Sequence, residues 1–417
     1  MIRIDAKFSF YKAGQGSFYG GRILHQEINK VFTIVYDCGT NTFITGNSKS
    51  LNNEITYFKH HPHYFPHNDE IELLFISHLD YDHVSGLKRL LKEFKVKNII
   101  LPYIEKQYRQ FFLVSFSENN DPNNDLSLDD YTSFIESPNT FIQNNSTDTQ
   151  IYFVKSSSET TYQNYDENQL DLNNAYARGT QPNVNPEELN SEPNVSVYEN
   201  NLQFFIRKDW EFTTYAKSVS AEAIKKLHTS LQKILKKKSN YNLSLEDLKN
   251  IVTTKRIEAH KCYTKCIGEI NSHGLVLLHG PIGFKRLHGI TSSNCELNHC
   301  NHCDEYRFDN KNRMLGTLLL GDVSINPKNN PIDLPVAFIK KLDNVHVVQV
   351  PHHGSSKNWD FTKFNALKIG ANINRWENRI LTVCNFGYGN KYGHPSHEVI
   401  NNLRSIIFLN TQFSRLN

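Results

Sequence analysis

The sequence has no uninterrupted apolar run that approaches the ~18 to 20 residues of a membrane span. Its first seven residues lack the charged-then-apolar layout of a secretory signal. No repeat at the periods typical of solenoids is visible either. We therefore expect a cytoplasmic protein without a membrane-embedded segment.

The amino-acid composition excludes several further classes of protein. Of the 417 residues, 38% are hydrophobic, 12% aromatic and 21% charged. This balance can bury a sizeable core, and it excludes a wholly disordered, collagen-like or coiled-coil chain. The length allows two or three domains, or one elaborated α/β domain.

The net charge of +3 conceals an uneven distribution. Residues 118–200 carry 15 acidic and two basic side chains, a net charge of −13, which leaves +16 for the rest of the chain. A basic remainder indicates a phosphate-bearing partner, such as nucleic acid or another phosphodiester. The alternative is that the basic part only offsets its own acidic segment.

The first 105 residues read as short strands with one helix. We expect strands at 31–36, 71–76 and 96–101, and a helix over 84–94 whose leucines recur at helical spacing. A strand–helix–strand order of this kind predicts a parallel pair of strands.

Beyond residue 105 the pattern changes. Residues 106–200 are rich in Asn, Asp and Ser and read as an acidic insertion, although apolar islands such as 151–154 indicate contact with the rest of the fold. Residues 217–267 predict a basic helical insertion, whose lysines are either simply solvated or face nucleic acid. From 271 onward strands recur, and 275–278 is a candidate partner of 317–320.

The strongest chemical signal is the segment 77–86. It places His78, Asp80, Asp82 and His83 within six residues, directly after a buried strand and before a helix. A tight turn there would aim imidazoles and carboxylates into one space, so the segment predicts a metal site. A merely polar turn is the weaker alternative.

Further motifs follow in order along the chain. They are Gly14-Gln15-Gly16-Ser17, Tyr36-Asp37-Cys38-Gly39, Leu319-Leu320-Gly321-Asp322, Pro351-His352-His353-Gly354-Ser355 and Tyr392-Gly393-His394-Pro395. Together with segment 77–86 they resemble the metallo-β-lactamase fold family, and most closely the hydrolase domain of ComEC-type DNA-uptake proteins. Ser17 replaces the Asp of that subgroup.

The resemblance implies an α/β fold, a four-layer αββα sandwich. Its N-terminal half would span 1–105 and its C-terminal half 201–417, interrupted by the acidic insertion at 106–200, the helical insertion at 217–267 and a Cys-rich segment at 283–312.

The resemblance also implies a metal centre with one or two divalent ions. Its ligands would be His78, Asp80, Asp82, His83, a bridging Asp322 and a late histidine, for which spacing favours His352 while His353 stays open. The sequence departs from the family's pattern at two positions, and both make the first metal site richer in oxygen ligands. Asp80 replaces an imidazole, and Asn271 stands where the family has His, with His273 as a substitute two residues away. Oxygen ligands favour Mn²⁺, Mg²⁺ or a weakly held Zn²⁺.

Bound metals would lower the pKa of water toward neutrality and polarise the electrophile. Asp82 or Asp80 would orient the water, and His394 would stabilise an oxyanion or protonate a leaving oxygen unless it is a structural turn residue. We expect four further side chains to bind a phosphate: Ser355, Ser356, Asn358 and Lys391.

Five of the seven cysteines are clustered. Their spacing predicts a small structural zinc knuckle, and free thiols are the alternative. The cluster consists of Cys262, Cys266, Cys295, Cys300 and Cys303. The histidines at 60, 61, 63 and 67 read as loop residues, because no carboxylate accompanies them.

Three functions are consistent with these motifs. The first is a metal-dependent phosphodiesterase or nuclease. The second is hydrolysis of a small molecule such as a cyclic nucleotide, lactone, thioester or β-lactam, because a fold alone does not select a substrate. The third is a module that binds partner proteins through its insertions.

Overall fold

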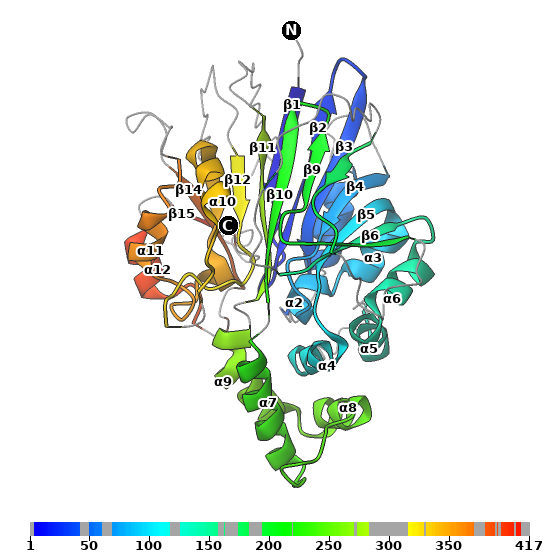
Figure 1. The fold of residues 1–417 in the computed structure, drawn as a ribbon, viewed down its shortest axis with the longest axis vertical. Helices are drawn as coiled ribbons and strands as arrows, with labels where there is room; N and C mark the ends of the chain where they lie inside the picture. The colour runs from blue at the N-terminus through cyan, green and yellow to red at the C-terminus, as the bar shows by residue number, and fades with distance from the viewer. Residues whose placement is uncertain are drawn as a thin grey trace, which may run out of the picture.

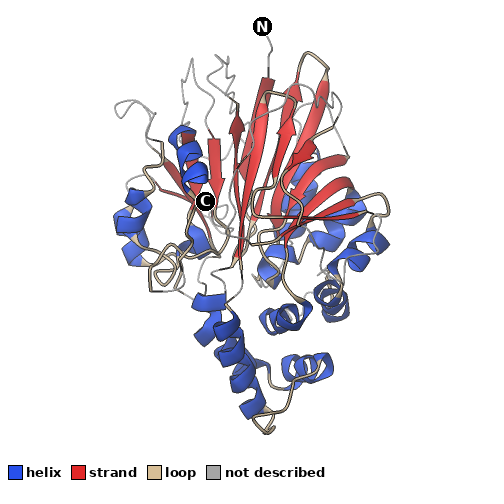
Figure 2. Cartoon of the chain, viewed as in Figure 1, coloured by secondary structure: helices blue, strands red, loops and turns tan. Residues whose placement is uncertain are grey.

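The computed structural model describes residues 4–41, 50–60, 69–116, 126–156, 162, 174–182, 194–218, 220–270, 273–282, 316–328, 331–370, 380–387, 390, 393–403 and 406–409. They form two mixed β-sheets that lie face to face, with helices over the outer face of each sheet (Figure 1, Figure 2). In these ranges no helix is both long enough and apolar enough to cross a bilayer.

The first sheet has seven strands in the order β1-β2-β3-β4-β5-β6-β8. They are β1 (Ile4–Phe10), β2 (Phe18–His25), β3 (Lys30–Cys38), β4 (Glu70–Phe75), β5 (Lys95–Pro102), β6 (Gln150–Val154) and β8 (Val195–Tyr198). β1 to β3 are antiparallel, and the strands from β3 to β8 pair in parallel. The parallel pair of β4 and β5 confirms the predicted strand–helix–strand unit, with α3 (Leu87–Glu93) as its helix.

The second sheet has eight strands in the order β15-β14-β13-β12-β11-β10-β9-β7. They are β7 (Tyr176–Arg178), β9 (Gln203–Ile206), β10 (Trp210–Lys217), β11 (Gly274–Pro281), β12 (Gly316–Leu319), β13 (Val345–Gln349), β14 (Leu381–Asn385) and β15 (Ile406–Leu409). β12 to β15 pair in parallel and the others are antiparallel. The predicted pairing of 275–278 with 317–320 is confirmed by Leu278 opposite Leu318.

The two sheets share one apolar layer between them. Phe75 of the first sheet stacks on Phe212 of the second, with ring centroids 5.9 Å apart, and meets Phe204 edge-on at 6.2 Å. All three rings are fully buried. Each such ring contributes about 1.5–3 kcal/mol to the stability of the fold relative to an exposed one, so this layer joins the sheets firmly.

Helices cover the outer faces and complete four layers. Over the first sheet lie α1 (Ser50–His60), α2 (Tyr81–Val84), α3, α4 (Lys106–Arg109), a 3₁₀ helix at Gln110–Ser115, α5 (Leu128–Glu136) and α6 (Pro138–Asn145). Over the second lie α10 (Val336–Ile339), 3₁₀ helices at Lys340–Asn344 and Pro351–Gly354, α11 (Phe361–Ala366) and α12 (His397–Asn402). This arrangement is consistent with a metallo-β-lactamase-type sandwich.

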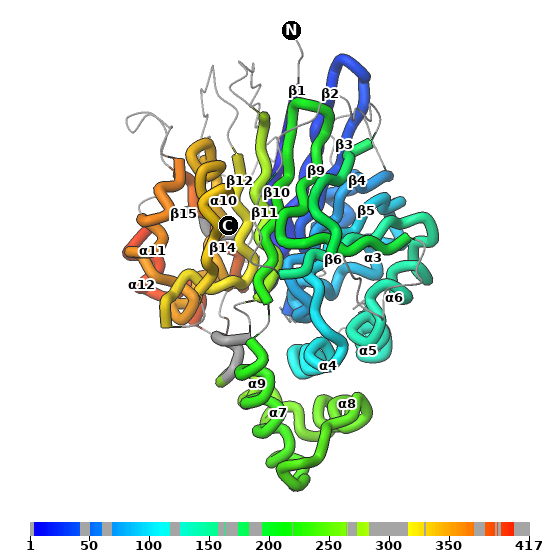
Figure 3. The backbone as a smooth tube through the Cα atoms, in the orientation of Figure 1, coloured from blue at the N-terminus to red at the C-terminus, as the bar shows by residue number. Residues whose placement is uncertain are grey.

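Residues 220–270 form a helical arm at the end of the sandwich where α2 lies (Figure 1), and the path of the arm is clear in the backbone tube (Figure 3). The arm contains α7 (Ala221–Ile234), α8 (Leu245–Thr254) and α9 (Arg256–Ile270). The side chain of Ser220 caps α7 and that of Ser244 caps α8, because each accepts a hydrogen bond from a free backbone N–H of the first turn. These helices lie in the range where the sequence predicts a basic helical insertion, although α9 continues beyond residue 267 to Ile270.

The range 106–200 contributes directly to the sheets. β6 and β8 extend the first sheet and β7 lies at the edge of the second, while α5 and α6 pack on the first. The apolar island at 151–154 is therefore a strand between two parallel neighbours. Division of the chain into domains at 105 and 200 stays a prediction.

His279 gives the fold a specific dependence on pH. The ring is buried between the sheets, where Trp210 Nε1 donates to its Nδ1 at 3.3 Å and its Nε2 lies 2.8 Å from the hydroxyl of Tyr19. Burial lowers the pKa of His279 to about 3. The unfolded chain therefore takes up a proton at pH values where the native ring stays neutral, and stability falls as pH drops below about 6.5.

As the pH falls from 6.5 to 4, we expect this histidine to lower the free energy of unfolding by up to about 1.4 kcal/mol per pH unit. His279→Gln keeps a donor and an acceptor but does not titrate, so its slope should be smaller by that amount. Urea denaturation of both proteins at several pH values measures the difference. Equal slopes would show that another group is responsible.

Candidate metal centre

The turn between β4 and α3 brings together four side chains that can bind a metal. His78 follows β4, Asp80 is the extended residue that precedes α2, and Asp82 and His83 lie on α2 itself. Each is at most 9% exposed. The sequence folds this way because an apolar strand ends where a polar turn starts a short helix, so both elements point their side chains into the same space.

Two glycines allow the turn to lie against the end of β3. A Cβ on Gly39 would lie 2.5 Å from backbone carbons of both Asp82 and His83, and one on Gly16 would lie 2.7 Å from the carbonyl oxygen of Asp82. Real Cβ atoms do not come this close, so both positions require glycine. The glycine motifs near residues 16 and 39 thus shape the site without contributing a ligand.

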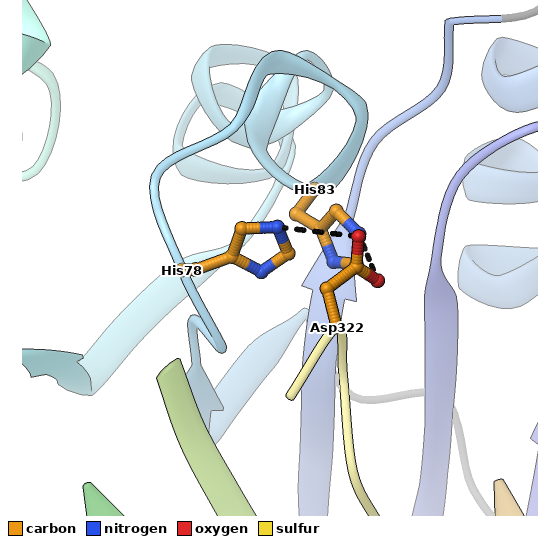
Figure 4. Close-up of side chains that lie close together, drawn as sticks. All are labelled: His78, His83 and Asp322. Atoms are coloured by element: carbon orange, nitrogen blue, oxygen red, sulfur yellow. Dashed lines mark ion pairs between the residues drawn. The ribbon is translucent and has the colours of Figure 1, made fainter. Parts of the chain in front are cut away.

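Asp322 enters the site from the second sheet. It follows β12 through Gly321, which has φ of +55° and lies against Ser77. Asp322 Oδ2 lies 3.7 Å from His78 Nε2, and Oδ1 lies 3.3 Å from His83 Nε2. Figure 4 shows the three side chains pointing toward one another. Asp322 is therefore central to the group, and its role as a bridging ligand stays a prediction.

His352 and His353 approach from the end of β13. Their φ angles of 46° and 54° are left-handed, an unusual conformation for two successive non-glycine residues that turns both rings toward the centre. His353 Nε2 lies 3.4 Å from Asp82 Oδ2, and His352 Nε2 lies 3.6 Å from Asp322 Oδ2. The arrangement groups His353, rather than the His352 that spacing favoured, with Asp82 and His83.

Each late histidine is oriented through its other ring nitrogen. His352 Nδ1 lies 2.9 Å from the side-chain oxygen of Asn358, and His353 Nδ1 lies 2.9 Å from the backbone carbonyl of Asn385. Both acceptors require Nδ1 to carry the proton, which leaves Nε2 with its lone pair toward the centre. Partners of this kind fix the orientation and tautomer of metal-binding histidines.

Asp37 performs the same role for His83. Its Oδ2 lies 2.8 Å from His83 Nδ1, and its two oxygens also accept hydrogen bonds from the backbone N–H and hydroxyl of Ser77. Burial disfavours a charged ring, but Asp322 and Asp37 outweigh it and hold the pKa of His83 well above its ordinary value. Sequence reasoning assigned no role to Asp37; its position in Tyr36-Asp37-Cys38-Gly39, immediately after the predicted strand at 31–36 and near the end of β3, is the signal that was available.

The carboxylates of the turn repel one another. Burial, and then the nearby Asp82, raise the pKa of Asp80 to about 8, although a hydrogen bond of 2.6 Å from the hydroxyl of Tyr263 opposes this. Burial also lowers the pKa of His78 well below its usual range, with His83 as the next cause. A divalent cation between these groups would relieve the repulsion, because it favours ionised carboxylates and neutral imidazoles.

The side chains present fit one or two divalent metals. Three overlapping groups have their ligand atoms within 4.8 Å of one another: His78, His83 and Asp322; Asp82, His83 and His353; and His78, Asp80 and Asp82. Within the described part of the chain, the buried Nε2 atoms of the three histidines lack a hydrogen-bond partner. Buried nitrogens are rarely left in this state unless a water or an ion completes them.

His273 lies beside these groups but is not a member of them. Its ring is fully buried, with its centroid 5.9 Å from that of His78 and 4.8 Å from that of Phe112. The expectation that it replaces a missing ligand therefore stays a prediction. Asn271 lies outside the described residues.

The residues predicted to contact phosphate have different environments. Asn358 is fully buried, holds His352 and donates to the backbone carbonyl of Asp322, so it supports the ligands. Ser355 is buried as well, whereas Ser356 is half-buried. Lys391 lies outside the described residues. A phosphate-binding role for these side chains stays a prediction.

His394 lies at the rim of the centre. Its ring centroid is 5.7 Å from that of His352, and its backbone is held on both sides by the side chain of Asn390. Burial, followed by the two late histidines, lowers the pKa of His394 to about 3, so the ring is neutral near pH 7. A neutral ring at this place can donate one N–H to an oxygen of a bound substrate.

The predicted zinc knuckle falls mostly outside the described part of the chain. Cys262 is a half-buried free thiol on α9. The side chain of Cys266 and all of Cys295, Cys300 and Cys303 are not described. The same holds for the histidines at 61, 63 and 67, while His60 ends α1. The structural zinc stays a prediction.

One comparison with known proteins bears on this site. A family model described as the metallo-beta-lactamase superfamily matches residues 66–144, the range that contains β4, the ligand turn and β5. No curated protein matches the chain. The family match supports a metallo-β-lactamase fold, and together with the His/Asp groups it suggests a metal-dependent hydrolase.

Proposed function

We propose that the protein is a metal-dependent phosphodiesterase that cleaves nucleic acid. The observation that carries the proposal is the buried cluster of His78, His83, His353, Asp82 and Asp322, whose ligand atoms converge from both sheets. Zn²⁺ and Mn²⁺ suit this mixture of nitrogen and oxygen donors. A cytoplasmic location and the ComEC-like specificity belong to the same proposal.

Metals bound there would supply a water of lowered pKa and a Lewis acid for the phosphoryl oxygen. Around them, Asp82 and Asp80 provide carboxylate oxygens that accept a hydrogen bond from this water and orient it. His394, held by Asn390 and close to His352, would donate its N–H to the leaving oxygen. Asn358 and Asp37 keep His352 and His83 in the required tautomers.

A polyanionic substrate is favoured by the helical arm. Six of its exposed lysines form no ion pair within the described residues: Lys233, Lys236, Lys238, Lys255, Lys261 and Lys265. The arm also reaches the centre, since Tyr263 of α9 bonds to Asp80. Unpaired cations on an arm that is joined to a hydrolytic centre attract a phosphate backbone and raise its local concentration.

A substrate panel tests the proposal directly. Single- and double-stranded DNA, RNA and bis-p-nitrophenyl phosphate are incubated with Mn²⁺, Zn²⁺ or EDTA. We expect cleavage of at least one nucleic acid that needs the metal and weakens steeply with salt. Salt-independent turnover of a neutral ester or lactone, with every nucleic acid left intact, would contradict the nuclease and favour a small-molecule hydrolase.

Removal of lysines from the arm should weaken the binding of nucleic acid. A triple variant, Lys233→Gln, Lys261→Gln and Lys265→Gln, should lower oligonucleotide affinity about tenfold at 0.1 M salt and reduce the slope of log K against log salt by about 2 to 3. Fluorescence anisotropy without metal measures both quantities.

The control removes three exposed lysines from the side of the second sheet, Lys328, Lys340 and Lys363. Its net charge is the same, so only the place of the charge differs. If both triple variants lose the same affinity, general charge rather than the arm binds the oligonucleotide.

A further inference from the structure

Tyr263 connects the helical arm to the metal centre. It lies on α9, is 1% exposed, and donates its hydroxyl hydrogen to Asp80 Oδ1 over 2.6 Å. The contact joins residues 183 positions apart in the sequence. A buried tyrosine aimed at one oxygen of a candidate ligand is a specific arrangement, because a phenylalanine would fill the same volume without the bond.

The backbone around Asp80 is held by other residues. Tyr131 donates to the carbonyl of Leu79, and the backbone N–H of Tyr81 donates to the hydroxyl of Ser115. These partners belong to elements that pack on the first sheet. The side chain of Asp80 forms no capping bond to α2. Tyr263 therefore restrains the carboxylate, while the sandwich restrains the main chain.

The second oxygen of Asp80 faces the centre. Asp80 Oδ2 lies 3.8 Å from His78 Nε2, and Asp80 forms one ligand group with His78 and Asp82. With Oδ1 bound to Tyr263, the carboxylate cannot rotate freely, and Oδ2 stays available as the ligand atom. Groups that orient metal ligands in this way typically raise metal affinity 10- to 100-fold.

We infer that Tyr263 is a positioning residue through which the helical arm controls how tightly the Asp80 side of the centre holds a divalent cation. The inference rests on the proposed metal centre but not on the identity of the substrate. Coupling between metal binding and the packing of α9 is reciprocal, so a bound cation also stabilises the packing of α9 on the sandwich. A partner or substrate that moves the arm would then change metal occupancy.

Tyr263→Phe removes the hydroxyl and keeps the ring. We expect its dissociation constant for Mn²⁺, measured by calorimetric titration of the metal-free protein, to rise 10- to 100-fold for one class of site. Tyr241→Phe is the matched control, because its hydroxyl also bonds to an aspartate of the arm, Asp247, at 2.8 Å but away from the centre. It should bind Mn²⁺ like the wild type. Equal affinity in Tyr263→Phe and the wild type would overturn the inference.

Hydrogen exchange on the wild type tests the coupling without any substitution. Addition of Mn²⁺ should slow amide exchange in α9 at least several-fold and leave β1 unchanged. Unchanged exchange in α9 at saturating Mn²⁺ would refute the coupling even if a variant failed to fold. If the wild type binds no divalent cation at all, the proposed metal centre itself is wrong. Failure of the coupling can therefore be distinguished from failure of the metal centre.

Discussion

Replacing Asp322 by asparagine should remove metal binding and lower phosphodiester hydrolysis about 10³-fold or more. This carboxylate lies close to four histidines: its oxygens lie 3.3 to 3.7 Å from Nε2 of His78, His83, His352 and His353. Asparagine has nearly the same shape but no charge, so it cannot balance two cations. The measurements are metal content by mass spectrometry and the rate with bis-p-nitrophenyl phosphate.

Asp129→Asn is the control for this substitution. Asp129 lies in the first turn of α5 with 92% of its side chain exposed and an ion pair to Lys249. Such a surface pair contributes little, so metal content and rate should equal those of the wild type. Asp322→Asn with a full complement of metal would show that the centre is not organised around this residue.

Gly39→Ala should strongly destabilise the fold and distort the site. The new Cβ would lie 2.5 Å from the backbone of Asp82 and His83, and all three nearest atoms belong to the main chain. No side-chain rotation can relieve this overlap, so α2 must move away from β3. We expect a loss of about 3 kcal/mol in the free energy of unfolding, together with weaker metal binding.

Gly20→Ala tests the specificity of this effect. Gly20 lies on β2, where a Cβ would come 3.2 Å from the carbonyl of Ile34 and from a ring carbon of Phe58. The ring can shift slightly, so a loss of about 1 kcal/mol is expected, and metal affinity should stay unchanged. Denaturant titration compares the two variants. A Gly39→Ala protein as stable as the wild type would contradict the close packing of the ligand turn on β3.

Local sequence was sufficient to predict part of this site. His78, Asp80, Asp82 and His83 lie between a short apolar run and a helical leucine pattern, and both patterns depend only on neighbouring residues. The parallel pairing of β4 with β5 follows from the same segment. Asp322 also lies where its motif predicts, a few residues beyond the end of an apolar strand.

Contacts between distant segments could not be predicted in this way. The bond from Tyr263 to Asp80 depends on how α9 docks, and the choice between His352 and His353 depends on two left-handed residues that no spacing rule anticipates. In the range 106–200, short apolar segments stand among polar residues, so composition concealed that β6 and β8 extend the first sheet.

Metal analysis of the wild-type protein tests the central claim most directly. The protein is dialysed against Zn²⁺ or Mn²⁺, freed of unbound metal by gel filtration, and assayed for metal per chain beside Asp322→Asn. The described ligand groups predict one to two equivalents of divalent metal in the wild type, and at most a small fraction of that in Asp322→Asn. Because the predicted cysteine knuckle would add zinc to both proteins, the difference between them is the decisive quantity. An equal metal content in the two proteins would contradict the account.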